Sequence, residues 1–232
     1  MDPDSRVAAA WDAEYRSGRY ASEPAVALVE EILREARSRG ISSGLDLGCG
    51  NGRNYGPLVD GGLDLLGLDV SSEAIRQLAA RRPDRADRLR VGDLSALPVD
   101  ARFPLVVGIQ VFQHGVRAAC HHHLRAAQAR VEARGLFALR VNAVGTEYEY
   151  AHEVVERGAD GSVTVRYVDG PKRGLPIHFF DRAELERLFA DEFDPVVGLR
   201  RSVTVRTTPA GGHWDQWEAI WQRRGPRAAG RA

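Results

Sequence analysis

The spacing of apolar residues in the first forty positions predicts helices. Apolar side chains recur every three or four residues in segments 8–15 and 26–33, which places them on one face of a helix. Gly18 and Pro24 lie between the two segments and favour a break there. The pattern therefore predicts two helices, the second of which ends before Gly40.

Short apolar segments and helical segments alternate over the next hundred residues. The segment before Ile109 is apolar enough to be buried on both faces, as in a central parallel strand. Strands that alternate with helices predict a parallel sheet covered by helices on both faces. The predicted strands are 45–47, 65–70, 89–93, 103–109 and 136–141, and the predicted helices begin near Asn54, at 71–72 and at 117, the last one running to Arg134.

The pattern changes after Val141. Two segments rich in β-branched residues, 154–157 and 162–167, are separated by a turn sequence with two glycines, which predicts a hairpin. Asp181 and Glu184 have the spacing of a capping box, which predicts a short helix. Two further strands are predicted to close the chain, at 196–207 and 214–221.

A glycine-rich segment, LDLGCGNGRN at residues 45–54, follows the first predicted strand. Glycines let the backbone turn sharply and leave no Cβ between the chain and a ligand. A strand, such a turn and a helix form the setting in which a nucleotide-like ligand lies across the end of a sheet. The dinucleotide fingerprint G-x-G-x-x-G needs a third glycine where this chain has Arg53.

Three acidic residues lie at the ends of successive predicted strands. Asp46 precedes the first glycine by two residues. Asp69 lies 23 residues after Asp46, and Asp93 lies 24 residues after Asp69. A carboxylate at Asp69 can accept hydrogen bonds from both hydroxyls of a ribose, and one at Asp93 can accept from an adenine amino group. The three acids and the glycine turn form a specific pattern for a nucleoside ligand.

This pattern resembles the class I S-adenosylmethionine-dependent methyltransferases of small-molecule type. LDLGCGNGR resembles their first motif, GLDVS their ribose-binding acid, and VGDLSALP their adenine-binding segment. The resemblance is strong over residues 44–141 and looser for the segment W-D-x-x-Y at 11–15 and for the closing strands. It implies an α/β fold, doubly wound around a mostly parallel seven-stranded sheet (a Rossmann-like methyltransferase fold).

The resemblance also implies a set of cofactor-binding residues. The glycine turn would surround the methionine part, Asp69 the ribose and Asp93 the adenine, while a tyrosine near the amino terminus would close over the methionine end. The implied residues are Asp46, Gly48, Cys49, Gly50, Gly52, Asp69, Val70, Asp93, Leu94, Gln110, Tyr15 and Tyr20.

Catalytic residues are harder to predict. Methyl transfer mainly requires that the nucleophile is held in line and desolvated, and a base is needed only if the acceptor loses a proton. His114 and His178 are the candidate bases, because histidine titrates near neutral pH. The run 121–123 is expected to be a solvated helix face, with no metal. The predicted acceptor pocket contains Arg140, Asn142, Tyr148 and Tyr150.

The predicted organisation has three parts. Residues 1–40 form an amino-terminal helical arm or lid, and residues 41–222 form the cofactor-binding domain. An insert at about 143–180, after the fifth strand, is expected to form the acceptor pocket and part of a lid. Residues 223–232 are expected to form a flexible tail.

Composition excludes several partners. Thirty-two basic residues balance 32 acidic ones, so the net charge gives no support to binding of nucleic acid or of an anionic membrane. No apolar run reaches the length of a membrane helix, and no apolar segment at the start of the chain predicts a signal peptide. Cys49 and Cys120 cannot form a disulfide framework. We therefore expect a cytoplasmic monomer or homodimer with a small-molecule acceptor.

The predicted function is transfer of a methyl group from S-adenosylmethionine to an O, N, S or C centre of a small molecule by direct displacement, with S-adenosylhomocysteine as the product. Two alternatives stay open from the sequence. One is an NAD(P)-dependent oxidoreductase on the same sheet topology. The other is a protein that binds S-adenosylmethionine without catalysis.

Overall fold

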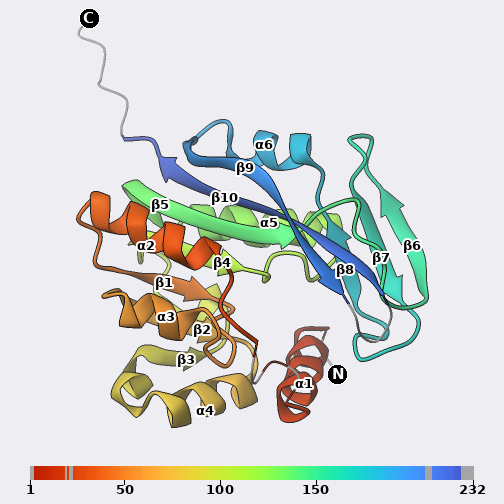
Figure 1. Cartoon of the computed structure of the whole chain (residues 1–232), viewed down its shortest axis with the longest axis horizontal. Coiled ribbons are helices and arrows are strands. Elements are labelled where there is room, and N and C mark those ends of the chain that lie inside the picture. The colour runs from red at the N-terminus through yellow and green to blue at the C-terminus, as the bar shows by residue number, and fades with distance from the viewer. Residues whose placement is uncertain (1–2, 19, 21–22, 207–210, 226–232) are drawn as a thin grey trace, which may run out of the picture.

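The computed structural model describes residues 3–18, 20, 23–206 and 211–225. Two helices, α1 (Pro3–Arg16) and α2 (Leu28–Ser38), precede the first strand. The break predicted at Gly18 and Pro24 is confirmed. The two helices differ in position, because α2 is part of the core and α1 lies apart from it near the edge of the sheet (Figure 1). The prediction of one helical arm over residues 1–40 is therefore wrong for α2.

The main sheet has seven strands in the order β3-β2-β1-β4-β5-β10-β9. The first five in this order run parallel, and β10 runs antiparallel to both β5 and β9. This confirms the predicted mostly parallel, seven-stranded sheet. The strands are β1 (Ser43–Leu47), β2 (Asp64–Asp69), β3 (Leu89–Val91), β4 (Phe103–Ile109), β5 (Val131–Asn142), β9 (Phe193–Arg206) and β10 (Gly212–Arg223).

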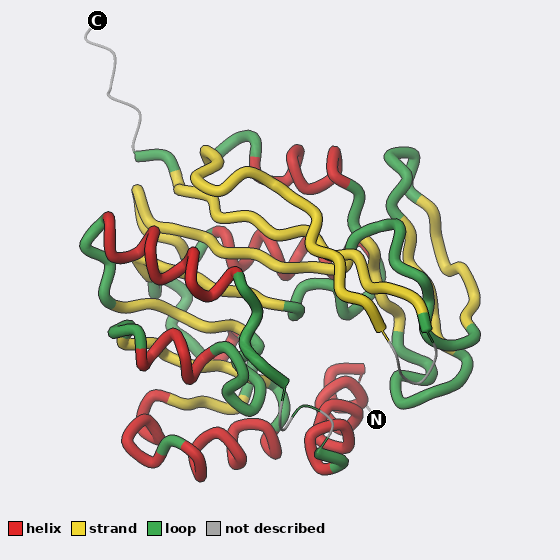
Figure 2. The backbone as a smooth tube through the Cα atoms, in the orientation of Figure 1, coloured by secondary structure: helices red, strands yellow, loops and turns green. Residues whose placement is uncertain are grey.

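Helices cover both faces of this sheet (Figure 2). On one face α2, α3 (Tyr55–Asp60) and α4 (Ser72–Arg81) pack on side chains such as Leu105 and Leu136. On the other face α5 (Arg117–Gln128) and α6 (Arg182–Phe189) pack on Val106 and Phe137. Burial of these two apolar layers holds the strand ends, and therefore the loops after them, in fixed positions.

A second, small sheet lies beyond the carboxyl ends of the parallel strands, on the right in Figure 1. It consists of β6 (His152–Arg157), β7 (Val163–Tyr167) and β8 (Pro176–Phe179), all antiparallel. The predicted hairpin is β6 and β7. The third strand, β8, joins them through the backbone and bridges to His114 in the loop after β4.

The boundary between α5 and β5 differs from the prediction. The helix ends at Gln128 and the strand begins at Val131, whereas the sequence pattern extended the helix to Arg134. The pairing of β5 with β4 shifts in register between Phe103 and Leu105. Pro104 lies at this shift and has no N–H to donate, so β5 bulges there, with Arg134 at a φ of 65°.

The predicted flexible tail begins too early. β10 continues to Arg223, whose guanidinium donates to the Val131 carbonyl at 2.8 Å and pairs with Glu192 at 2.5 Å. Arg224 pairs with Asp194 at 2.9 Å. Residues 226–232 lie outside the described part of the chain.

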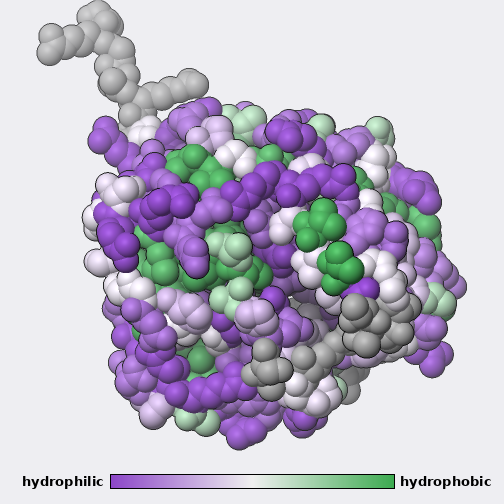
Figure 3. Space-filling view, in the orientation of Figure 1, coloured by the Kyte–Doolittle hydropathy of each residue, from purple (hydrophilic) through white to green (hydrophobic). Residues whose placement is uncertain are grey.

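Figure 3 shows one face of the molecule, where hydrophobic residues form separate small groups among hydrophilic ones. Within the described ranges, no helix has the length and hydrophobicity required to cross a membrane.

Candidate active site at the carboxyl edge of the sheet

The glycine loop lies between β1 and α3. Gly48, Gly50 and Gly52 all have positive φ, at 66°, 56° and 101°, a region that other residues rarely adopt. The N–H groups of Gly48 and Cys49 both donate to the Leu68 carbonyl, at 2.8 and 3.0 Å. These bonds fix the loop on the end of β2.

Two buried carboxylates lie under this loop. Asp69, at the end of β2, accepts from the N–H groups of Gly50 and Ser71 at 2.9 and 2.8 Å. Asp46, on β1, is 3% exposed, and its Oδ2 has no hydrogen-bond partner among the described residues. The structure therefore brings together the first two predicted acids, and it leaves one of them with an unsatisfied acceptor atom.

Burial changes the protonation of both acids. It raises the pKa of Asp46 to about 8, with a further contribution from the negative charge of Asp69. Burial also raises the pKa of Asp69 to about 6, against the opposing effect of its two backbone hydrogen bonds. Among the described residues no positive charge acts on either carboxyl. A ligand that supplies positive charge and N–H or O–H groups would therefore stabilise both ionised forms.

The third predicted acid lies at the outer edge of the same row. Asp93 is exposed and accepts from the Ser95 N–H at 2.8 Å, and hydrogen bonds from Ser95 hold the pKa of Asp93 below its usual value. Leu94 is half-buried, and Val70, directly after Asp69, is exposed. These residues keep the positions that the sequence predicted for an adenosine-binding edge.

Helix α1 is attached across this edge by Asp12. Its carboxylate accepts from the Ser71 hydroxyl at 2.5 Å, the Glu73 N–H at 3.1 Å and the Ser72 hydroxyl at 3.2 Å. Although desolvation opposes the effect, these hydrogen bonds lower the pKa of Asp12. Asp12 thus binds the first turn of α4 and holds α1 over the site.

Tyr15 of α1 lies directly on the glycine loop. A Cβ placed at Gly50 would be 2.6 Å from the Tyr15 hydroxyl oxygen. Burial and the nearby Asp69 carboxylate raise the pKa of Tyr15. The Gln77 side chain donates to the Tyr15 carbonyl at 3.0 Å, which ties this position of α1 to α4.

An aromatic group extends from Tyr15 toward the small sheet. Trp11 lies 6.2 Å from Tyr15, 6.3 Å from Tyr20 and 4.8 Å from His114, measured between ring centroids. Lys172, from the loop between β7 and β8, places its Nζ 5.2 Å from the Trp11 centroid. We call Trp11, Tyr15, Tyr20 and His114, together with the Lys172 ammonium that lies over Trp11, the aromatic group. It joins α1, the end of β4 and the insert.

The end of β4 is strained beside this group. Gln110 has a φ of 60°, rare for a residue with a side chain, and its N–H donates to the Arg140 carbonyl at 2.7 Å. Its own carbonyl lies 3.1 Å from His114 Nε2. Such strain is typical of ligand-binding positions.

Comparison with known proteins agrees with this geometry. Residues 45–137 match a family model described as a methyltransferase domain. The chain carries a methyltransferase domain. A comparison with curated proteins finds no match.

Solved structures with the same fold include methyltransferases of low sequence identity. One is an S-adenosylmethionine-dependent methyltransferase from Clostridium acetobutylicum ATCC 824, with TM-score 0.61, 13% identity and coverage of 92% of this chain and 99% of that one. Another is the 1,6-didemethyltoxoflavin-N1-methyltransferase of Burkholderia thailandensis, with TM-score 0.64, 20% identity and coverage of 97% and 92%. A third is the magnesium protoporphyrin IX methyltransferase of Synechocystis PCC 6803, with TM-score 0.63, 14% identity and coverage of 96% and 98%. They show that this is a class I methyltransferase fold.

The pKa of His114 differs from the value expected of a catalytic base. Burial, together with the charge of Lys172, lowers the pKa of His114 to about 3. The ring is therefore neutral at physiological pH and a poor proton acceptor. This low pKa does not favour the predicted role of His114 as a base.

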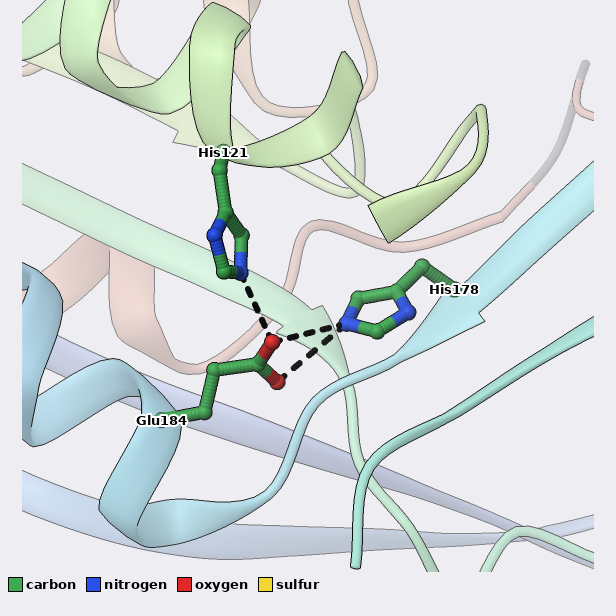
Figure 4. A group of neighbouring side chains, drawn as sticks. All are labelled: His121, His178 and Glu184. Carbon is green, nitrogen blue, oxygen red and sulfur yellow. Dashed lines mark hydrogen bonds and ion pairs between the residues drawn. The ribbon is translucent and has the colours of Figure 1, made fainter. Parts of the chain in front are cut away.

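His178 lies in the interior of the molecule, between the small sheet and the helices α5 and α6. It is fully buried on β8, and its two ring nitrogens lie 2.8 Å from the Thr164 hydroxyl and 3.2 Å from the Glu184 carboxylate. Figure 4 shows the ring directed toward Glu184 and His121, between β8, α5 and α6. Both nitrogens already have partners, so the structure contradicts the prediction of a catalytic base.

The cluster around Glu184 resembles a metal site in composition. Ligand atoms of His121, His178 and Glu184 lie within 4.8 Å of one another. However, the Glu184 carboxylate already accepts from Arg117 Nε at 2.6 Å, His121 Nε2 at 2.7 Å and the Asp181 N–H at 3.3 Å. Desolvation opposes ionisation, but these hydrogen bonds and charges hold the pKa of Glu184 well below its usual range. The cluster is therefore a buried ionic junction.

The predicted pocket residues are mostly engaged elsewhere. Arg140 is buried and pairs with Glu218 at 2.7 Å, on the face covered by α2. Tyr148 and Tyr150 pack in the apolar cluster of the small sheet. Asn142 is half-buried at the end of β5, and its carbonyl accepts from the Phe180 N–H at 2.9 Å. Of the four residues, Asn142 alone keeps a position at the edge of the site.

Sequence analysis did not select several residues that the structure places at this edge. Asp12 and Trp11 belong to the loosely matching segment at 11–15, which was the one signal available for them. The others are isolated in sequence and reach the site through tertiary contacts. The missed residues are Trp11, Asp12, Gln113, Lys172 and Gln216.

Proposed function

We propose that this methyltransferase domain transfers a methyl group from S-adenosylmethionine to a small-molecule acceptor. The observation that carries the proposal is the pair of buried acids, Asp46 and Asp69, under a glycine loop. Both have raised pKa values, and Asp46 has an acceptor atom with no partner. A ligand with an ammonium group and ribose hydroxyls supplies the missing charge and donors.

The residues at the edge fit this cofactor. S-adenosylmethionine supplies an electrophilic methyl group on a positively charged sulfur. Asp46 and the glycine loop would hold the amino acid part, Asp69 and Val70 the ribose, and Asp93 and Leu94 the adenine. The remaining residues proposed to hold the cofactor are Gly48, Cys49, Gly50, Gly52, Gln110, Tyr15 and Tyr20.

The rest of the chemistry is positioning. Helix α1, held by Asp12, covers the glycine loop and would exclude water from it. Direct displacement needs an aligned and desolvated nucleophile more than it needs an acid or a base. A neutral His114 and a structural His178 are consistent with a reaction that depends on neither an acid nor a base. The acceptor atom, O, N, S or C, lies on a compound that enters between α1 and the insert, which we propose acts as a lid.

Two observations support a small-molecule acceptor. The names of the Burkholderia and Synechocystis enzymes specify compounds of that size. The chain also has no net charge, which gives no support to nucleic acid as the substrate. An oxidoreductase is not favoured, because Arg53 occupies the third glycine position of the dinucleotide fingerprint and pairs with Glu23.

The compartment and the assembly are part of the same proposal. Cys49 and Cys120 are both buried and free, which supports a reducing compartment such as the cytoplasm. The domain would act as a monomer or homodimer on a diffusing substrate.

Calorimetric titration with S-adenosylhomocysteine tests the proposal. We expect binding to the wild-type chain and at least about tenfold weaker binding to Asp46→Asn, which cannot carry the negative charge. The fold should be retained, because Asp46 Oδ2 has no partner to lose. Equal affinity in the two proteins would contradict the assignment of Asp46, and absence of binding to the wild type would contradict the cofactor.

A further inference from the structure

Four buried side-chain atoms near the carboxyl ends of β1, β4 and β5 have no hydrogen-bond partner in the part of the chain that the structure describes. They are Asp46 Oδ2, Gln113 Oε1, His114 Nδ1 and Gln216 Oε1. Gln216 pairs in register with Asn142, the last residue of β5. Each of the four atoms can accept a hydrogen bond, Asp46 Oδ2 when its carboxyl is ionised. An unsatisfied buried acceptor is costly, so a matching ligand must bring N–H or O–H groups.

The protonation of His114 can be assigned from its contacts. Its Nε2 lies 3.1 Å from the Gln110 carbonyl oxygen, which can only accept, so Nε2 carries the hydrogen. In a neutral ring, Nδ1 then keeps its lone pair. Burial and Lys172 keep the ring neutral. His114 Nδ1 is therefore a fixed hydrogen-bond acceptor, shielded from solvent.

The surroundings of this nitrogen are aromatic. The Trp11 ring meets the His114 ring edge to face, with centroids 4.8 Å apart. Trp11 also lies 6.2 Å from Tyr15, which covers Gly50 of the glycine loop. Flat aromatic side chains favour flat ligands, which stack on them or meet their edges. The nitrogen is thus placed between the cofactor loop and the loop of the insert that carries Lys172.

We propose that the methyl acceptor is an aromatic or heteroaromatic compound with an N–H or O–H group, which donates a hydrogen bond to His114 Nδ1. This rests on the proposed function, and it narrows the substrate class of the same site. His114 then acts in binding and orientation, and Asp46 serves the cofactor. A ring that lacks this donor, or carries a methyl group in place of its hydrogen, would leave Nδ1 buried without a partner and should bind more weakly.

Pairs of small probes that differ by one methyl group test this proposal. We would measure binding of 2-naphthol and 2-methoxynaphthalene, and of indole and 1-methylindole, by calorimetry in the presence of saturating S-adenosylhomocysteine. The donor-bearing member of at least one pair should bind about tenfold more tightly than its methylated partner, because the partner leaves a buried acceptor unpaired. The ¹⁵N shift of His114 Nδ1 should change on addition of the donor probe.

Two substitutions at one position separate the two ring nitrogens. His114→Asn keeps an oxygen near the place of Nδ1 and should retain the preference for the donor probe. His114→Gln keeps a group near Nε2, which can still donate to the Gln110 carbonyl, and should lose the preference. The exposed His122→Gln, on α5, is the matched control and should behave like the wild type.

The outcomes separate this proposal from the one on which it rests. If S-adenosylhomocysteine fails to bind the wild-type chain, the proposed function is wrong and this proposal fails with it. If it binds, but the probes and their methylated partners bind equally or not at all, the assignment of His114 alone is wrong. Retention of the preference in His114→Gln would also overturn it.

Discussion

Two regions of this molecule bury carboxylates in opposite environments. At the glycine loop, Asp46 and Asp69 are buried without a positive charge, and their pKa values rise to about 8 and 6. At the junction of α5, β8 and α6, Glu184 is equally buried, but it accepts from Arg117, His121 and His178, and its pKa falls. We infer that the buried carboxylates that lack a compensating charge belong to a ligand site, whereas the buried carboxylate with charged partners serves the structure.

The largest effect on stability should come from a substitution at Glu184, the buried carboxylate with charged partners. Glu184→Gln removes the charge shared by Arg117, His121 and His178, while Arg117 keeps its pair with Asp160. It should lower the free energy of unfolding by about 2–4 kcal/mol, measured by urea denaturation. Glu186→Gln, on the same helix, breaks the exposed pair with Arg182 and should cost less than about 1 kcal/mol. Similar small losses in both variants would contradict a structural role for Glu184.

Substitutions at Asp46 and Asp69, under the glycine loop, should change ligand affinity more than the stability of the fold. Asp69→Ala removes the proposed acceptor of the ribose hydroxyls and should weaken S-adenosylhomocysteine binding at least tenfold, or about 1.5–3 kcal/mol. Titration calorimetry measures this loss, with thermal unfolding as the check that the variant folds. Unchanged affinity in a folded variant would show that the ribose lies elsewhere.

The two regions should also depend on pH with opposite signs. The raised pKa values of Asp46 and Asp69 keep these groups protonated in the fold after the unfolded chain has ionised. Their contribution to stability is therefore full below about pH 4 and is lost as pH rises through 6 to 8. Glu184 has a lowered pKa, so its contribution is present above about pH 4.3 and is lost as pH falls.

Cofactor binding should follow the ionisation of the unsatisfied pair. S-adenosylmethionine should bind up to about a hundredfold more tightly at pH 8 than at pH 6, because the fraction with both carboxyls ionised rises by that factor, and binding near neutral pH should release protons. Calorimetry in buffers of different ionisation enthalpy detects that release. Asp46→Asn should reduce it, and an unchanged proton release in this variant would contradict the role of Asp46.

A smaller effect should distinguish two glycines near the loop. Gly50→Ala places a side chain at positive φ and within 2.6 Å of the Tyr15 hydroxyl, so it should destabilise the fold by about 1 kcal/mol and weaken cofactor binding. Gly56→Ala, in α3, meets nothing within 4 Å and should be neutral or slightly stabilising. Chemical denaturation and calorimetry on both variants check the difference.

Sequence patterns predicted the parts of the molecule that depend on local chemistry. The glycine loop, the acids at the strand ends, the break between α1 and α2 and the capping box of α6 are all short-range features, and the structure confirms their geometry. The bulge opposite Pro104 was missed, because the predicted helix extends to Arg134, which lies inside β5.

The direction of a side chain was much harder to predict. His178 and Ile177 are neighbours on β8, yet His178 contacts Glu184 and Ile177 packs in the core of the small sheet. Arg140 was expected in the pocket, but a partner 78 residues away, Glu218, holds it on the other face. The sequence contains no short-range signal for such pairs, since tertiary packing decides which face each residue occupies.

We expect the glycine loop to bind S-adenosylmethionine. A thermal unfolding scan with S-adenosylmethionine, S-adenosylhomocysteine, NADH or no ligand tests it most directly. A ligand at about 100 times its dissociation constant stabilises a fold by roughly 2.7 kcal/mol, a rise in Tm of about 5–10 °C for a chain of this size. We expect this rise with both S-adenosyl compounds and none with NADH. No rise with either S-adenosyl compound, in a sample that unfolds cooperatively, would contradict the account.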